Sequence, residues 1–185
     1  MRKTIALTAA AVALAGCGML PNGQPQTVVE KTTTAPTQKE QQSAPPQPTE
    51  PIASRESKVG SGGQYGKARV DITSLTRQGR TVTLNWTVTA TDGKVNLHNG
   101  MSTGTLDYTV SNVSLIDPVN AKRYRVARNG TGQDATCVCS GTQGQFLESG
   151  NASTLYAVFA APPPEVTKVN VEMPMIGVFT DVPLS

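Results

Sequence analysis

Hydrophobic and polar residues alternate without interruption from Arg80 to Ala90. The residues between the apolar positions are threonine or asparagine, and the apolar positions are Val82, Leu84, Trp86, Val88 and Ala90. A period of two, with β-branched residues on the polar side, predicts a strand that is buried on one face. Residues 68–72 alternate in the same way, and turn-forming residues at 77–80 separate the two runs. We therefore expect a hairpin.

Four further strand-forming segments follow this hairpin at short intervals, over residues 106–115, 122–128, 155–161 and 169–173. The apolar phase changes at Ser111-Asn112, which predicts a β-bulge or a bend. Asp117-Pro118 predicts a turn, because proline pre-sets the backbone angle there. Residues 155–161 are apolar on both faces and predict a central strand, which ends where three consecutive prolines cannot donate to a ladder.

Many short strands without helical periodicity predict an all-β sandwich or barrel. All eight aromatic residues lie between Tyr65 and Phe179, which places one folded domain at residues 64–185. We expect an immunoglobulin-like β-sandwich, because a domain of about 120 residues with seven or eight strands suits that fold. Trp86 is expected to fill the core without the usual inter-sheet disulfide.

The N-terminal residues have the order of a secretory signal. Met1-Arg2-Lys3 is a short positive start, and Ile5–Ala15 is uncharged and too short to span a membrane, which takes about 20 apolar residues. Leu14-Ala15-Gly16-Cys17 then has the pattern of a bacterial lipobox. We predict a lipoprotein signal peptide over 1–16, lipid attachment at Cys17, and a location on the extracytoplasmic face of the cell membrane. An ordinary cleaved signal is the alternative.

Residues 17–63 differ in composition from the rest of the chain. From Gly18 to Gly63 this segment holds seven of the thirteen prolines, no aromatic residue and equal numbers of basic and acidic side chains. So little apolar area cannot offset the entropy of ordering, so we predict a lipid-anchored disordered linker. A flexible coil of this length averages roughly 40 Å end to end. It can be a plain spacer or a glycosylated stalk.

Charge is close to balanced. The chain has 16 basic and 13 acidic residues, and loss of the leader leaves 14 against 13, which argues against general nucleic-acid binding. One basic run has no acidic residue within it: Lys122, Arg123, Arg125 and Arg128. This run predicts contact with an anionic wall polymer or with lipid headgroups. The alternative is an edge strand whose charges prevent it from pairing with another chain.

Two cysteines remain once Cys17 carries lipid. Cys137 and Cys139 form an even pair in an oxidising compartment, which predicts a disulfide. Residues two apart on an extended strand have Cα atoms about 6.6 Å apart, near the upper limit for a disulfide, so the bridge requires a local kink. A structural bridge is the expectation, and thiol-disulfide exchange is the alternative.

The sequence offers little support for catalysis. His98 is the only histidine and lies in a segment of loop composition, and there is no glycine-rich phosphate loop. Two neighbouring sulfurs and one histidine do not make a tetrahedral metal site. We therefore expect no enzyme activity, cofactor or metal, and a domain that binds or scaffolds an envelope partner. A thiol-disulfide accessory enzyme and a small-ligand sensor are the competing hypotheses.

Several features together resemble one protein family. The leader, the Pro/Thr-rich segment, Asp117-Pro118, Lys122, Tyr124 and Cys137-Val138-Cys139-Ser140 look like actinobacterial envelope lipoproteins of unknown function. That family has a C-terminal immunoglobulin-like (telokin-like) domain and no established catalytic residue. Some relatives are encoded beside peptidoglycan-binding proteins of the outer-membrane-protein-A type, so the resemblance implies an envelope partner. The oligomeric state is not indicated.

Overall fold

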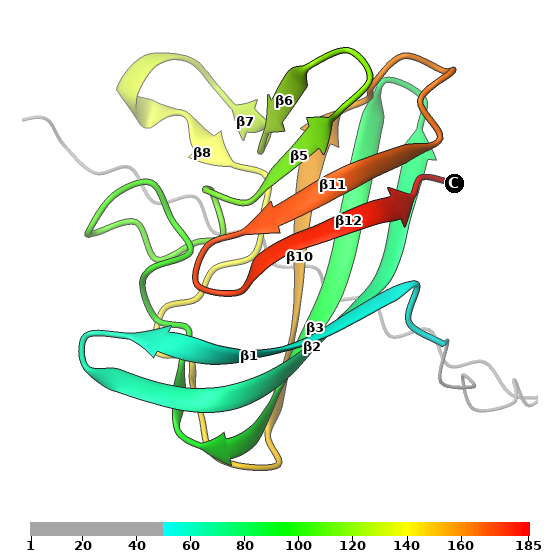
Figure 1. Ribbon diagram of the computed structural model, residues 1–185. Coiled ribbons are helices and arrows are strands. Elements are labelled where there is room, and N and C mark those ends of the chain that lie inside the picture. Colours follow the sequence, from blue (N-terminus) through cyan, green and yellow to red (C-terminus); the bar gives the residue numbers. More distant parts are fainter. Residues whose placement is uncertain (1–49) are drawn as a thin grey trace, which may run out of the picture. The chain divides into compact units, whose positions relative to one another are not determined.

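The computed structural model describes residues 50–185 (Figure 1). The predicted signal peptide, Cys17 and most of the predicted linker lie outside the described residues. Within residues 50–185, no helix is long and apolar enough to cross a membrane.

Two four-stranded antiparallel sheets pack face to face, which confirms the predicted β-sandwich. The first sheet has the order β1-β2-β3-β10, with β1 Ala53–Ser61, β2 Gln64–Gln78, β3 Thr81–Gly93 and β10 Ala152–Ala160. The second has the order β12-β11-β5-β6, with β5 Ser114–Asp117, β6 Lys122–Arg125, β11 Lys168–Met173 and β12 Gly177–Pro183. Figure 1 shows the second sheet as a layer in front of β2, β3 and β10.

Short elements complete the domain. Two-stranded ladders join β4 to β9 and β7 to β8, and the helical content of the described residues is one 3-10 turn. Their bounds are β4 Val95–Asn96, β7 Arg128–Asn129, η1 Gly132–Asp134, β8 Thr136–Cys137 and β9 Phe146–Leu147.

The apolar face of β3 is buried, as its alternating sequence predicts. Its apolar residues are fully buried between the sheets, and Trp86 is the largest of the fully buried side chains. The neighbouring strand β2 pairs with β3 along almost its whole length, and Gly79 takes a positive φ of 60° in the turn between them. The predicted hairpin is therefore confirmed. The Trp86 indole Nε1 is buried and has no hydrogen-bond partner among residues 50–185, so apolar packing holds this ring.

The start of the domain differs from the prediction. The sequence places residues 53–63 in the linker, but Ala53–Ser61 forms β1, which pairs with β2 from Ala53↔Ile72 to Ser61↔Gln64. Only Val59 of this strand is a large, fully buried apolar residue, so the strand lacks an apolar alternation that sequence patterns detect. Its stability comes from the backbone ladder with β2.

Three other expectations change in the structure. Residues 106–110 form an irregular loop rather than a strand, and β12 follows β11 as a strand that the sequence did not predict. The strand expected at 122–128 changes sheets: its first part pairs with β5, and then Val126 bridges Phe159 of β10. This crossing, together with the segment around Cys139, covers the free edge of β10.

The strand order also differs from the immunoglobulin fold. Three consecutive strands, β1, β2 and β3, lie side by side in one sheet here. In the immunoglobulin fold the third consecutive strand crosses to the opposite sheet. The sandwich is therefore confirmed at the level of its two layers, while its connections are its own.

The β1 pairing predicts that the domain needs residues 53–61. A chain that begins at Gln64 loses the ladder along β2 and the burial of Val59, and its free energy of unfolding should fall by at least about 3 kcal/mol relative to a chain that begins at Glu50. Urea unfolding followed by Trp86 fluorescence measures both. Equal midpoints for the two chains would show that residues 53–61 belong to a linker.

Candidate anion-binding groove

The four cations of the predicted basic run make different contacts within the domain. Arg123 forms an ion pair with Glu172 and also donates to the Ser114 hydroxyl, 2.9 Å away. Arg128 donates to the carbonyl of Ala135. Lys122 and Arg125 are exposed, and neither has a carboxylate within 4.0 Å among residues 50–185.

The pairing of Arg123 has an electrostatic consequence. Its hydrogen bond to the Glu172 carboxylate, assisted by that of Ser114, holds the pKa of Glu172 below its ordinary value of 4.5. Arg123 is thus paired with a carboxylate, whereas Arg128 donates only to a carbonyl and keeps its full charge. Contact with an anion stays a prediction for Lys122, Arg125 and Arg128.

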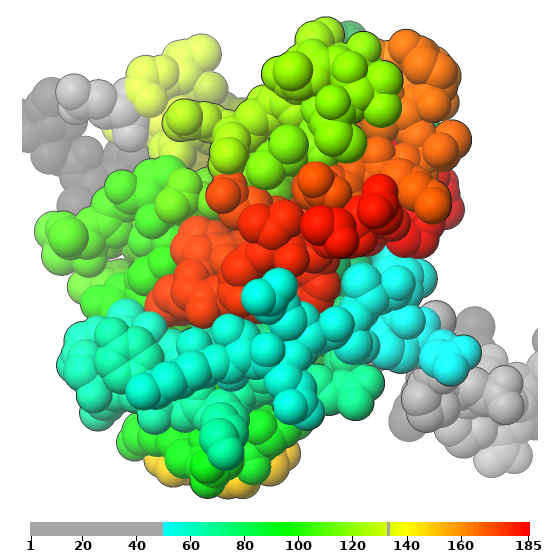
Figure 2. Space-filling view, in the orientation of Figure 1, coloured from blue at the N-terminus to red at the C-terminus, as the bar shows by residue number. Residues whose placement is uncertain are grey.

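A surface groove of about 560 Å³ brings Lys122 together with residues that the sequence analysis did not select. Its walls are the β2–β3 turn, the start of β6 and the chain that follows β10. Figure 2 shows the atoms of the β5–β6 turn next to those of the segment after β10, in yellow-green and orange. The polar and rigid lining residues are Arg77, Arg80, Lys122, Tyr124 and Pro162-Pro163-Pro164.

Arg77 builds one wall of the groove. Its guanidinium donates to the carbonyls of Pro162, Pro163 and Val166, at 2.5, 3.3 and 3.2 Å. These contacts attach the proline segment to β2. Because carbonyls carry only partial charge, the full positive charge of Arg77 stays uncompensated by any carboxylate within 4.0 Å among the described residues.

Arg80 and Lys122 are the exposed cations of the groove. Arg80 lies in the β2–β3 turn and Lys122 begins β6, and within residues 50–185 neither side chain forms a salt bridge or a hydrogen bond. Arginine presents a planar fork of donors that matches phosphate and carboxylate oxygens, whereas lysine supplies a point charge. Together with Arg77, they give one groove three cations from two distant parts of the chain.

Tyr124 is the aromatic residue of the groove. It is half-buried, and burial together with the negative charge of Asp117 raises the pKa of its phenol above 10.0. The phenol is therefore protonated at neutral pH and can donate to an anionic oxygen. A phenolate, which would repel an anion, does not form.

The β5–β6 turn positions Lys122. Asp117 is fully buried, and its carboxylate accepts from the side chain of Asn120 at 2.8 Å and from two backbone N–H groups, of Val119 at 3.0 Å and Asn120 at 3.1 Å. These bonds hold the pKa of Asp117 below 3.8, with the Asn120 side chain as the main cause. The predicted Asp117-Pro118 turn is therefore present, and the buried carboxylate organises it.

The arginines of the groove had only a weak signal in the sequence. Arg77 and Arg80 flank Gly79 in the segment predicted as a turn, and a turn rich in cations is usually a solvated loop. Their partner Lys122 lies more than 40 residues later in the chain. Only the packing of the two sheets brings these positions to one groove.

Cys137 and Cys139 are joined by a disulfide, as the sequence analysis expects. Their Cα atoms are 5.4 Å apart, closer than in a regular strand, so the chain is kinked between them. The backbone on either side is tied to neighbouring strands: Val138 donates to Ala127 at 2.9 Å and accepts from Val158 at 3.0 Å. Both cysteines pack against the core, so the bridge fixes the segment that covers the β10 edge.

His98 lies in a loop, as the composition of its segment predicts, and its ring makes packing contacts there. Its ring stacks on Tyr108 at 4.3 Å and on Phe146 at 5.3 Å between centroids, and its Nδ1 accepts from the Gly144 N–H at 2.8 Å. These contacts give the ring a packing role. No group of three or more metal-binding side chains lies together among residues 50–185.

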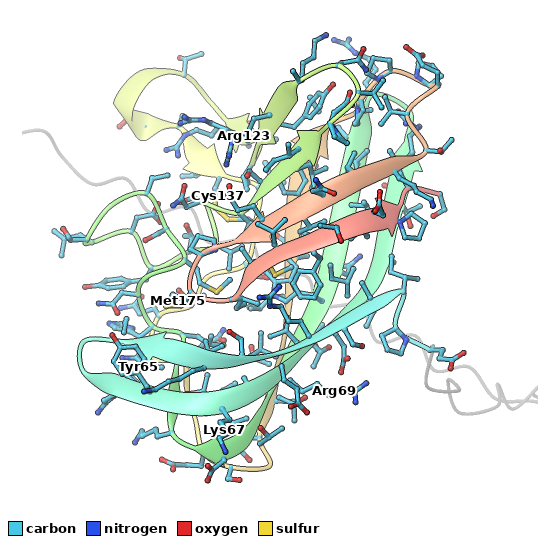
Figure 3. The ribbon with its side chains drawn as sticks, in the orientation of Figure 1. Tyr65, Lys67, Arg69, Arg123, Cys137 and Met175 are labelled. Carbon is cyan, nitrogen blue, oxygen red and sulfur yellow. A yellow bond between two sulfur atoms is a disulfide. The ribbon has the colours of Figure 1, made fainter. Side chains whose placement is uncertain are left out.

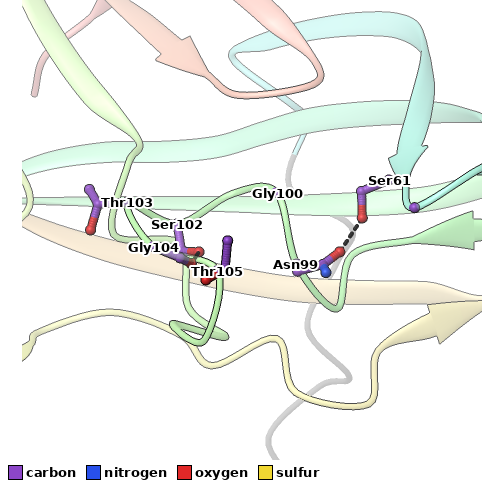
Figure 4. A pocket seen from close by; sticks show the side chains of 8 residues that line it. Ser61, Asn99, Gly100, Ser102, Thr103, Gly104 and Thr105 are labelled. Atoms are coloured by element: carbon purple, nitrogen blue, oxygen red, sulfur yellow. Dashed lines mark hydrogen bonds between the residues drawn. The ribbon is translucent and has the colours of Figure 1, made fainter.

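A second recess, of about 440 Å³, lies at the other end of the first sheet (Figure 4). Side chains of serine, threonine and asparagine line it, and a dashed line in Figure 4 marks the hydrogen bond that Ser61 donates to Asn99. The lining residues carry no charge and no aromatic ring. This recess therefore has neither feature that the groove offers to an anion.

Known proteins offer little direct guidance. No family model matches the chain, and neither does any curated protein. Among solved structures, the chain is similar to MPT63, a secreted protein from Mycobacterium tuberculosis with a crystal structure at 1.5 Å resolution. The two are 17% identical with a TM-score of 0.39, and the match covers 68% of this chain and 92% of that one. At this distance the similarity says nothing about the groove.

The Asp117 turn predicts a pH-dependent contribution to stability. Because the folded state lowers this pKa, the ionised carboxylate stabilises the fold above pH 3.8, and the effect is lost as the pH falls through the lowered value. At neutral pH, Asp117→Ala should lower the urea midpoint clearly, and the difference from the native chain should shrink below pH 3.8. Asp134→Ala, at an exposed position, is the control. A pH-independent difference would contradict this role.

Proposed function

We propose that this chain is an exported lipoprotein whose β-sandwich binds an anionic polymer of the cell envelope, without catalysis. The leader and the lipobox that ends at Cys17 support export and lipid anchoring. The observation that carries the binding function is the groove with three cations and no paired carboxylate within the described residues.

The groove suits a polymer of repeated phosphate or carboxylate groups rather than a small metabolite. It is an open surface groove, so a long ligand can pass along it. Arg77 is fixed by three carbonyls, whereas Arg80 and Lys122 are free to follow a flexible chain. Exposed contacts of this kind are individually weak, about 0.2–1 kcal/mol each, so useful affinity requires several at once.

The attachment point adds to this proposal. The described chain enters the first sheet at Ala53, which pairs with Ile72, only five residues before Arg77. The groove therefore lies toward the end of the domain at which the N-terminal segment arrives. A lipid on Cys17 would keep the domain within the linker's reach of the membrane, where a polymer attached to the envelope is accessible.

The binding function predicts sensitivity to charge in the groove. Arg80→Glu with Lys122→Glu should weaken binding of long-chain inorganic polyphosphate by about tenfold or more, since two attractive contacts become repulsive. Binding of the native chain should also weaken as salt is added, because these cations are exposed. Isothermal titration at two salt concentrations measures both effects.

A matched control separates the groove from net charge. Arg125→Glu changes the charge on the same strand, but Arg125 does not line the groove. It should leave polyphosphate affinity nearly unchanged. An equal loss for Arg125→Glu, or no loss for the double variant, would exclude the groove as the binding site.

Lipid anchoring predicts a distinct result for Cys17→Ser. Removal of the thiol leaves no acceptor for the lipid. One acyl chain gives only marginal membrane attachment and two chains give firm attachment, so the unmodified protein should not be retained. The variant protein should therefore appear in the medium or remain as unprocessed precursor, as measured by fractionation and intact mass. A processed Cys17→Ser protein that stays in the membrane fraction would rule out this anchor.

A further inference from the structure

One pair of facing residues breaks the charge pattern on the outer side of the β1–β2 hairpin. Along this face, Glu56 lies opposite Arg69, and Arg69 also contacts Asp71 at 2.9 Å, so opposite charges adjoin. The next facing pair is Lys58 and Lys67. Like charges directly opposite each other on a sheet are destabilising.

The two lysines are only partly neutralised within the domain. Lys67 lies 3.7 Å from the carboxylate of Asp92, while Lys58 has no carboxylate within 4.0 Å among residues 50–185. The Lys58 ammonium instead lies 5.2 Å from the centre of the Tyr65 ring. The hairpin thus keeps one excess positive charge beside an aromatic ring.

The Tyr65 ring is open to solvent. It is 54% exposed, and its cross-strand neighbour is Gly60, which has no side chain to cover it. Figure 3 shows Tyr65 at the closed end of the hairpin with Lys67 nearby, well separated from Arg123 of the second sheet. The exposed ring is therefore available to stack on a ligand.

Two facing glycines bring the end of β3 close to this ring. Gly66 pairs with Gly93, and a Cβ on Gly66 would lie 2.7 Å from the carbonyl oxygen of Asp92. This close approach sets the Asp92 carboxylate beside Lys67. The result is a recess of about 310 Å³ lined by Lys58, Tyr65, Gly66, Lys67, Asp92 and Gly93.

We infer that this recess binds a pyranose sugar that carries a carboxylate. The apolar face of the sugar ring stacks on Tyr65, its carboxylate lies between Lys58 and Lys67, and Asp92 accepts hydrogen bonds from its hydroxyls. The anion relieves the repulsion between the lysines, which accounts for their pairing. This site is separate from the basic groove and does not depend on it.

Two sugars that differ only in the carboxylate test the inference. The full chain is titrated with methyl β-D-glucuronide and with methyl β-D-glucoside, and backbone amide shifts are followed by NMR. The glucuronide should shift the amides of residues 58, 65–67 and 92–93, and the glucoside should bind about fivefold more weakly, as expected for loss of an exposed charge contact. Equal affinities, or no shifts at these residues, would overturn the inference.

Variants separate binding from folding. Lys58→Gln removes the like-charge repulsion, so the urea midpoint should stay the same or rise while the preference for the glucuronide is lost. Tyr65→Ala should abolish binding of both sugars, whereas Tyr156→Ala, which removes another exposed tyrosine on β10, should not. A Lys58→Gln chain that keeps its preference, or a Tyr65→Ala chain that still binds, would also overturn it.

Discussion

The long ladder between β2 and β3 is the constraint on which the rest of this domain depends. It runs from Gly66↔Gly93 to Gln78↔Thr81, with two register shifts. Its inward residues form one wall of the core, with Trp86 at the centre. β1 pairs with the outer edge of β2 and β10 pairs with β3, so both flanking strands take their position from this hairpin. Burial of apolar side chains between the sheets then holds the second layer in place.

Both candidate sites lie on this hairpin, at opposite ends. The groove includes Arg77 and Arg80 at its turn, and the recess includes Tyr65 and Lys67 at its start. Ten residues of extended strand separate Lys67 from Arg77, which corresponds to about 33 Å. Both sites carry positive charge that nearby carboxylates do not fully neutralise. The nearly neutral net charge of the chain therefore conceals two local concentrations of cations.

The two sites use different physical means to hold cations together. In the groove, backbone carbonyls of the proline segment fix Arg77, and the buried Asp117 turn presents Lys122. In the recess, the cross-strand register alone places Lys58 opposite Lys67, and close packing of Gly66 against β3 places Asp92 beside them. The groove depends on tertiary contacts between distant segments, whereas the recess depends on the local geometry of paired strands.

The basic run shows why a site is hard to predict from sequence. Four cations within seven positions suggested one surface, but neighbouring side chains on a strand point to opposite sides. Arg123 is paired with Glu172, which lies 49 residues later. The arginines that join Lys122 lie over 40 residues earlier, in what the sequence marked only as a turn. β1 was missed for a related reason, since its position is set by backbone pairing with β2 rather than by its own apolar pattern.

The sequence by itself determined which segments have a face to bury, because period-two alternation is a local property of the chain. It therefore predicted β3, its hairpin with β2, the Asp117 turn and the core position of Trp86. It also determined that Cys137 and Cys139 are close enough to bridge. Only the tertiary structure decided which strands adjoin and which charges meet. Those outcomes depend on contacts between residues far apart in the chain, whose geometry no local pattern encodes.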